Sequence, residues 1–379
     1  MTVRLAARNR DLSVRGVATV LTVTLVLMCA VPAFAKDKKE KEGAEASAGP
    51  IFYPDAPEQP RIQFLRMLRK PSDVQPKVGG FKAFVLGRDK DDSEDKPLGK
   101  PYGVAINDGR VFVCDTMTGL VSIFDIQRKR FDILGSGNRG NTQKPINISF
   151  DKDGTAYVCD SKLRRVMVYG PDLSYKTAFG EPDKVCPVDV AIFGDELYVC
   201  DVDNGQIVVF NKTDGKEIRR FGSKGSKEGE LFLPSNLAVD ADGNVYVSDT
   251  GNTRVEKFDP QGKFVRQFGA NGDQPGTFTR PKGIALDHQR RLYAVDAAFE
   301  NVQIFDPEGQ LLLFFGSSGT TAGTLCLPAK IAIDYDNVDL FKDYVAPGRE
   351  IEYLILVTNQ YGENAINIYG FLKDKPQAP

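Results

Sequence analysis

Five aspartates and one asparagine end similar apolar segments along this chain, and carboxylates repeated in this way could form a ring that holds a metal cation. The segments read FVCD, YVCD, YVCD, YVSD, YAVD and LVTN. A binding site needs one copy of a residue, whereas a structural role recurs in every repeat. We therefore predict that each side chain accepts hydrogen bonds from backbone N–H groups of the turn that follows it. The six residues are Asp115, Asp160, Asp201, Asp249, Asp296 and Asn359.

Three of the aspartates directly follow a cysteine, and thiolates are good ligands for zinc. These cysteines, Cys114, Cys159 and Cys200, hold the same position in successive repeats. A repeating fold spreads equivalent positions apart, so we predict that the three thiols pack as small apolar groups. Five cysteines follow residue 35, and an odd number leaves at least one without a partner in the chain. The disulfide state is left open.

The chain has one histidine, His288, which excludes any site that needs two imidazoles from one chain, such as bis-His haem. Two Asp-x-Asp-Gly sequences, at 151–154 and 240–243, resemble the start of a calcium loop. Neither has a glutamate at the twelfth position, so we interpret both as hairpin turns. An acidic run at 89–95 is interleaved with lysine and is interpreted as a solvated loop. We predict no metal site, no cofactor and no catalytic residue; weak calcium binding is the alternative left open.

Residues 1–35 have the features of a secretory signal peptide. Four arginines precede the apolar run Val17–Val31, and Ala-Phe-Ala follows it, so we predict cleavage between Ala35 and Lys36. The apolar run is shorter than the ~20 residues of a membrane span. We expect a periplasmic or secreted protein, with an uncleaved N-terminal membrane anchor as the alternative. Cleavage takes the net charge from −2 to near −5, which argues against nucleic-acid binding.

Internal repeats organise the chain from residue 101 onward. Six prolines recur at intervals of 42–47 residues, and each begins a stretch of alternating polarity. An aromatic residue stands nine places after each of the five aspartates, and a glycine closes the unit. Four short segments in each unit are separated by turn sequences such as Asp-Gly and Pro-x-Gly. The prolines are Pro101, Pro145, Pro187, Pro234, Pro281 and Pro328.

Four antiparallel strands per unit, repeated six times, predict an all-β fold: a six-bladed β-propeller of four-stranded antiparallel blades. The sixth unit has only three good strands, and Arg61–Met67 is left over before the first unit. We predict that this N-terminal strand joins the last blade beside Ile366–Phe371 and closes the ring. The predicted domains are a signal peptide (1–35), a disordered charged and Pro-rich linker (36–60), the propeller (61–372) and a tail (373–379). The blades are predicted at about 101–135, 145–180, 187–222, 234–269, 281–316 and 328–372 together with 61–70.

The repeat resembles the NHL repeat. The unit from Pro234 to Gly269 matches almost completely its elements Pro-x-x-apolar-Asp-x-Asp-Gly, aromatic-Val-x-Asp-x-x-Asn-x-Arg-Val and Phe-Gly. The other units are degenerate: the position of Arg254 holds Leu120, Gln206 and Asn301 in three of them, and Arg165 in the one that keeps the arginine. The resemblance covers roughly residues 61–372 and implies a six-bladed propeller of bacterial extracytoplasmic type. It says little about function, because propellers of this type serve as ligand platforms, enzymes and scaffolds.

We predict a non-catalytic protein-interaction scaffold whose partner is another envelope or secreted protein. The resemblance alone implies an association with envelope or multihaem-cytochrome assemblies. The alternative is a divalent-metal-dependent propeller hydrolase, lactonase or lyase. The channel-mouth groups that the sequence offers for such a site are Asn147, Asp189, Asn236 and Lys330, and their mixed charge with a lysine is poor for binding a cation. We expect no nucleic-acid partner and no membrane span after signal cleavage, and the oligomeric state is left open.

The expected binding surface is the face that carries the linkers between units and the turns after the repeated aspartates. Loops on a rigid scaffold carry most binding sites, and the units differ most in these loops. We place on the same face the long insert Asp336–Arg349 of the sixth unit. The candidate partner-binding residues are Met117, Lys162, Arg164, Asp203, Asn204, Phe299, Glu300 and Tyr344.

Overall fold

The computed structural model describes residues 49–75, 95–135 and 140–373, and every structural statement below concerns these residues. The signal peptide with its cleavage site, the linker up to residue 48, the acidic run up to residue 94 and the tail from residue 374 lie outside them. None of the helical turns in the described ranges has the length and hydropathy that a membrane-spanning helix needs.

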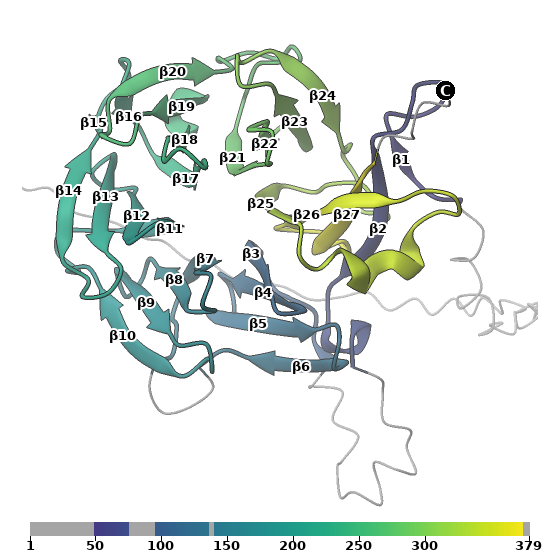
Figure 1. The fold of residues 1–379 in the computed structure, drawn as a ribbon, viewed down its shortest axis with the longest axis horizontal. Helices are drawn as coiled ribbons and strands as arrows, with labels where there is room; N and C mark the ends of the chain where they lie inside the picture. Colours follow the sequence, from purple (N-terminus) through teal and green to yellow (C-terminus); the bar gives the residue numbers. More distant parts are fainter. Residues whose placement is uncertain (1–48, 76–94, 136–139, 374–379) are drawn as a thin grey trace, which may run out of the picture. The chain divides into compact units, whose positions relative to one another are not determined.

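Six β-sheets surround a common centre and form a six-bladed β-propeller, as predicted (Figure 1). In five blades, four strands that follow one another in sequence run from the centre outward. Blade 1 contains β3 (Pro101–Asn107), β4 (Arg110–Asp115), β5 (Leu120–Asp125) and β6 (Arg130–Ile133); blade 2 contains β7 (Pro145–Phe150), β8 (Ala156–Asp160), β9 (Arg165–Tyr169) and β10 (Tyr175–Phe179). Blade 3 contains β11 (Pro187–Phe193), β12 (Glu196–Asp201), β13 (Gln206–Asn211) and β14 (Glu217–Phe221). Blade 4 contains β17 (Pro234–Val239), β18 (Val245–Asp249), β19 (Arg254–Phe258) and β20 (Phe264–Phe268); blade 5 contains β21 (Pro281–Leu286), β22 (Leu292–Asp296), β23 (Asn301–Phe305) and β24 (Leu311–Phe315).

Blade 6 joins the two ends of the propeller, as the sequence predicts. The N-terminal strand β2 pairs antiparallel with β27, and Ile62 lies opposite Phe371. The innermost strands then contact one another in the order β3, β7, β11, β17, β21 and β25, and β25 contacts β3 in turn. The strands of blade 6 are β25 (Pro328–Asp334), β26 (Ile351–Asn359), β27 (Ile366–Leu372), β2 (Ile62–Leu68) and β1 (Phe52–Tyr53).

The predicted boundary of the disordered linker at residue 60 is wrong, because Phe52–Tyr53 form β1 at the outer edge of blade 6. The Tyr53 hydroxyl donates a hydrogen bond to the Gly323 carbonyl oxygen at 2.8 Å. The Tyr53 ring also packs against Phe315 and Tyr369. Each aromatic side chain buries a large apolar area, so the aromatic residues of β1 hold this short segment in place although charged and proline residues surround it in the sequence.

The prolines and the repeated Asx residues mark the same end of every blade. Each proline is the first residue of an innermost strand and pairs with the Asx residue that ends the second strand, as Pro234 does with Asp249. Proline has no N–H to donate, so the first residue of a strand suits it. We call the face that holds these residues the linker face, since the linkers between blades reach it. Antiparallel strands alternate in direction, so the first and third turns of each blade lie at the opposite face.

The long insert of blade 6 lies at the opposite face, which corrects the prediction. It joins β25 to β26, and that connection starts at the end of β25 remote from Pro328. The insert contains a 3₁₀ helix, η4 (Val338–Tyr344). The Asn337 side chain before it accepts a hydrogen bond from the backbone N–H of Gly109, in the first turn of blade 1, at 2.9 Å. Tyr344 is therefore not part of the linker face.

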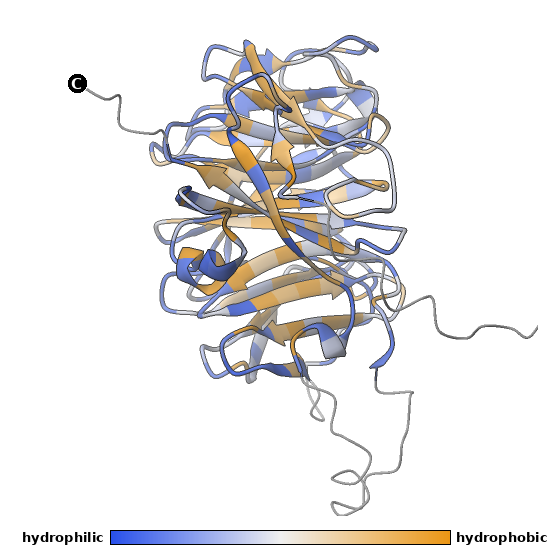
Figure 2. Ribbon diagram, turned by 90° about the vertical axis from the view of Figure 1, so that its right-hand side faces the viewer, coloured by the Kyte–Doolittle hydropathy of each residue, from blue (hydrophilic) through white to orange (hydrophobic). Residues whose placement is uncertain are grey.

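The hydrophobic core lies in layers between neighbouring blades. Figure 2 shows hydrophobic residues concentrated along the strands and hydrophilic residues in the turns. The aromatic residue nine places after each aspartate is almost fully buried, and each such side chain contributes about 1.5–3 kcal/mol through burial. These residues are Phe124, Tyr169, Phe210, Phe258 and Phe305.

Candidate functional site

The repeated aspartates link each linker to the turn beside it. Asp115 accepts four hydrogen bonds from backbone N–H groups, at 2.6 and 3.0 Å from the linker before β3 and at 2.9 and 3.1 Å from the turn after β4. Asp160 and Asp296 accept the same four bonds in their own blades. These carboxylates are buried, and amide donors occupy their lone pairs. The arrangement holds the linker face rigid.

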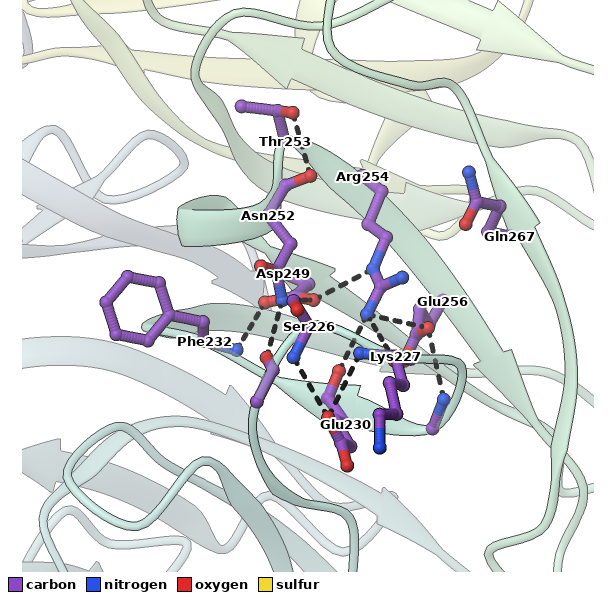
Figure 3. A network of polar contacts seen from close by, with 12 residues as sticks. Ser226, Lys227, Glu230, Phe232, Asp249, Asn252, Thr253, Arg254, Glu256 and Gln267 are labelled. Carbon is purple, nitrogen blue, oxygen red and sulfur yellow. Dashed lines mark hydrogen bonds and ion pairs between the residues drawn. The ribbon is translucent and has the colours of Figure 1, made fainter.

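Blade 4 adds a buried ion-pair network to this pattern (Figure 3). Arg254 Nε donates to the Asp249 carboxylate at 3.0 Å, and a terminal nitrogen of Arg254 lies 3.1 Å from Glu256. Both carboxylates are fully buried, and burial raises the pKa of Glu256 to about 7. The sequence does not reveal Glu256, because the same position in the other blades holds unrelated residue types. Arg254 also donates to two carbonyl oxygens of the linker before β17, so the network links that linker to the blade.

The cysteines of the repeat pack between blades. Cys114, Cys159 and Cys200 are fully buried, each in a different hydrophobic cluster. Burial raises the pKa of all three thiols. A thiol with a raised pKa stays protonated, which is the opposite of what a nucleophile or a metal ligand needs. Within the described residues all five cysteines are free.

Four of the residues predicted to bind a partner also form bonds to neighbouring loops. Arg164 forms an ion pair with Asp203 at 2.7 Å, which joins the turns of blades 2 and 3. The Asn204 side chain donates to a carbonyl oxygen of the linker before β11 at 3.1 Å. Glu300 accepts a hydrogen bond from the backbone N–H of Leu327 at 2.8 Å. These contacts connect neighbouring loops of the linker face, while Asp203 and Asn204 remain exposed.

The linker face nevertheless exposes a group of large apolar side chains. Met117 is 74% exposed, Lys162 beside the next aspartate is also exposed, and Phe299 is partly buried. Most of this group was not predicted from the sequence, although the apolar pair directly before Pro234 was a visible signal. The large apolar side chains exposed on this face are Met117, Leu120, Phe232, Leu233 and Tyr361.

The residues two places after the six prolines form a ring around the channel, which we call the polar ring. Four of them are the channel-mouth residues named from the sequence, and three of these four are in direct contact. Lys330 Nζ of blade 6 lies 2.5 Å from Asp189 Oδ2 of blade 3, on the opposite side of the channel. Asn236 Nδ2 of blade 4 donates to the same oxygen at 3.1 Å. The ring consists of Gly103, Asn147, Asp189, Asn236, Gly283 and Lys330.

Two features of the polar ring determine what it can hold. A Cβ on Gly283 would lie 2.5 Å from Lys330 Cα, so the blades approach too closely there for a side chain. The Oδ1 atoms of Asn147 and Asn236 are buried without a hydrogen-bond partner among the described residues. The ring thus has oxygen atoms suited to a cation, but the Lys330 ammonium already neutralises its one carboxylate.

A cavity of about 340 Å³ follows the polar ring along the channel. Aliphatic residues of all six innermost strands line it, and Lys330 is its one charged lining residue. Ser149 lines it as well, but its hydroxyl donates to the Val190 carbonyl oxygen at 2.6 Å. No nucleophile with an adjacent base lines this cavity.

Comparisons with known proteins agree on the fold. Residues 235–313, in blades 4 and 5, match the DUF5128 family, described as a 6-bladed beta-propeller. A protein of unknown function from Bacteroides thetaiotaomicron is 19% identical with a TM-score of 0.55, over 72% of this chain and 70% of that one. A gluconolactonase from Xanthomonas campestris is 16% identical with a TM-score of 0.54, over 73% and 87% of the two chains. A virginiamycin B lyase from Staphylococcus aureus is 14% identical with a TM-score of 0.51, over 72% and 94%. At these identities the chain is similar to the three proteins in its six-bladed propeller fold, and its function must be argued from its own residues.

Proposed function

We propose that this chain is an extracytoplasmic scaffold with NHL-type repeats that binds a partner protein through its linker face. The observation that carries the proposal is the set of large apolar side chains exposed there. Met117 is 74% exposed, Tyr361 53% and Leu233 49%. Exposed apolar groups on one face of a rigid fold are typical of protein-interaction sites. The linker hydrogen bonds to the repeated aspartates keep these side chains in fixed positions, which lowers the entropy cost of binding.

The opposite face offers a matched control for this surface. Phe193 and Tyr344 are exposed there by 37% and 41%. Both side chains can be replaced without touching the linker face. A difference between the two sets of variants would therefore show which face binds the partner, because both sets lose exposed apolar area.

Site-specific photocrosslinking in the native envelope tests the proposal. We expect a photoreactive residue at Met117 or Tyr361 to capture a defined protein, and one at Phe193 or Tyr344 to capture none. Serine at Met117 and Tyr361 together should abolish capture from a third linker-face position, Leu233, whereas serine at Phe193 and Tyr344 should leave it unchanged. Equal crosslinking from both faces would refute binding through the linker face.

The alternative is a divalent-metal-dependent hydrolase, lactonase or lyase, and the unpartnered oxygens of Asn147 and Asn236 favour it. The Lys330 ammonium beside Asp189 opposes it, because a cation there would meet a like charge. Calcium titration by calorimetry, with a lactone hydrolysis assay, separates the two functions. Calcium binding together with turnover that is lost on chelation would support the enzyme. We expect the wild-type chain to show neither calcium binding nor turnover, and the Lys330→Ser variant to bind calcium more tightly than the wild type.

A further inference from the structure

The mouth of the channel on the linker face is basic. Of the twelve residues that directly flank the six prolines, four are basic and none is acidic: Lys100, Lys144, Arg280 and Lys282. This bias contrasts with the chain as a whole, which carries slightly more acidic than basic residues. The prolines begin the innermost strands, so the flanking residues stand where the channel opens on the linker face.

Three of these cations stand at the start of innermost strands: Lys282 is the second residue of β21, Arg280 directly precedes β21, and Lys100 directly precedes β3. Lys282 is partly buried, and its pKa is lowered to about 8, first by burial and then by Arg280 and Lys100. Among the described residues, no carboxylate pairs with the side chain of any of the three. Clustered like charges without a counter-ion raise the free energy of the unliganded protein, and a bound anion would relieve the repulsion.

Tyr102 of blade 1 adds a neutral donor to this cluster. Its hydroxyl makes no hydrogen bond to any described residue, and its ring lies near both Arg280 and Asp189. The pKa of Tyr102 is raised by burial and then by the Asp189 carboxylate, so the hydroxyl keeps its proton. The negative charge of Asp189 is itself balanced by Lys330 at 2.5 Å. The one carboxylate of the polar ring is therefore paired, and the nearby Asp115 and Asp296 carboxylates accept hydrogen bonds from the backbone N–H groups of Lys100 and Arg280.

Apolar side chains border the cation cluster. Lys100 Nζ lies 5.2 Å from the centre of the Tyr361 ring, and Met117 packs beside Gly99, the residue before Lys100. Met117 and Tyr361 are the two most exposed large apolar residues of the linker face. A ligand that fills this region must present an anionic group and apolar groups within a few residues of each other. A protein segment with acidic and apolar side chains meets that requirement.

We propose that Lys282, Arg280 and Lys100 bind a carboxylate from an acidic, partly apolar segment of the partner protein at the channel mouth. This inference rests on the proposed role of the linker face and specifies the chemistry of its partner. Lys282 and Arg280 supply charge-assisted hydrogen bonds, Tyr102 supplies a neutral one, and Met117 and Tyr361 contact the apolar side chains.

The amine reactivity of Lys282 gives a direct test in the whole protein. Acylation by a small reagent across a pH series, read by mass spectrometry of the Lys282 peptide, reports the pH at which the amine loses its proton. We expect a midpoint near 8 without ligand. At constant ionic strength, succinate or a synthetic Glu/Leu-rich peptide should raise it by about one unit, because a bound carboxylate stabilises the ammonium. The same peptide with Gln in place of Glu should leave it unchanged.

Peptide affinity, measured by fluorescence anisotropy, completes the test. Lys282→Met should weaken binding of the Glu/Leu-rich peptide about tenfold or more, because a charged hydrogen-bond partner is lost. Lys144→Met removes a cation from the same face but outside the cluster, and should change affinity less than about twofold. A Lys282 midpoint unaffected by both succinate and the acidic peptide would overturn the inference, as would equal effects of the two variants. Either result leaves the crosslinking test of the linker face untouched, so the two proposals fail separately.

Discussion

Glu256 in blade 4 and Gln303 in blade 5 hold the same place in their blades, and each accepts a hydrogen bond from a glycine N–H of the preceding linker. The distances are 3.3 Å from Gly229 and 2.7 Å from Gly276. Blade 5 thus shows that an amide is sufficient for the structural role. The carboxyl group of Glu256 adds a buried ionisable group that blade 5 does without.

We expect Glu256→Gln to stabilise the propeller at pH 8 by about 1 kcal/mol and to change little at pH 4.5. The pKa of Glu256 in the folded protein is about 7, above its ordinary value of 4.5. Between these values the folded state keeps a proton that the unfolded state releases, so wild-type stability falls as the pH rises through this window. Urea unfolding from pH 4.5 to 8 should show that slope in the wild type and a flatter profile in the variant. Gln303→Glu is the matched control and should introduce a new loss of stability in blade 5; identical profiles for wild type and Glu256→Gln would contradict the prediction.

We expect Lys330→Met to destabilise the protein by about 3–5 kcal/mol, because it leaves the Asp189 carboxylate buried without its counter-charge. Asp189→Asn alone should also destabilise, by leaving the ammonium unpaired. The double variant should recover most of the loss, since neither charge remains. Guanidinium unfolding of the three variants gives the coupling energy. Additive single effects would show that the 2.5 Å contact is energetically unimportant.

We expect deletion of residues 61–70 to abolish soluble expression, because it removes β2 and leaves β27 with an unpaired edge. Removal of only residues 49–60, which include β1, should give a soluble protein with a lower melting temperature. The Tyr53 contacts with Gly323 and Phe315 are then lost while the ring stays closed. Expression trials and thermal unfolding measure both outcomes, and a stable protein lacking 61–70 would disprove closure by β2.

We expect the mature protein to begin at Lys36, after the predicted signal peptide. Intact-mass measurement and N-terminal sequencing of protein from the periplasm or the medium check this directly. Replacing Ala33 and Ala35 with bulky residues should leave the precursor uncleaved, because the peptidase requires small residues at both positions. A mature protein that retains residues 1–35 would favour the N-terminal anchor.

The fold was predictable because its determinants recur. Each blade repeats a proline at the start of its first strand and an Asx residue at the end of its second, and six copies make chance coincidence negligible. The closing strand was predictable by counting, since Arg61–Met67 was left over. The sequence-based prediction placed the blade 6 insert on the wrong face. The insert connects the first and second strands of its blade, and because antiparallel strands alternate in direction, that position alone puts it on the face opposite the linker face.

The candidate site was only partly predictable, because its contacts join residues far apart in sequence. Lys330 and Asp189 are separated by 141 residues, and only the geometry of a six-membered ring places blades 3 and 6 opposite each other. The cation cluster at the channel mouth has the same origin, since Lys100 and Lys282 belong to different blades. The contacts of the loop side chains were equally hidden, because the partners of Arg164, Asp203 and Glu300 belong to neighbouring blades or linkers.

The pairing of β2 with β27 also sets the order in which the molecule can be completed. Ile62 is among the first residues of the propeller to be synthesised, and its partner Phe371 is among the last. Five blades can form from segments that are neighbours in sequence while β2 remains unpaired. The final blade forms only when the two ends of the propeller meet. That last step carries the longest loop-closure entropy in the chain, so it should be the slow step of folding. Until it occurs, β2 remains an exposed strand edge available to other chains.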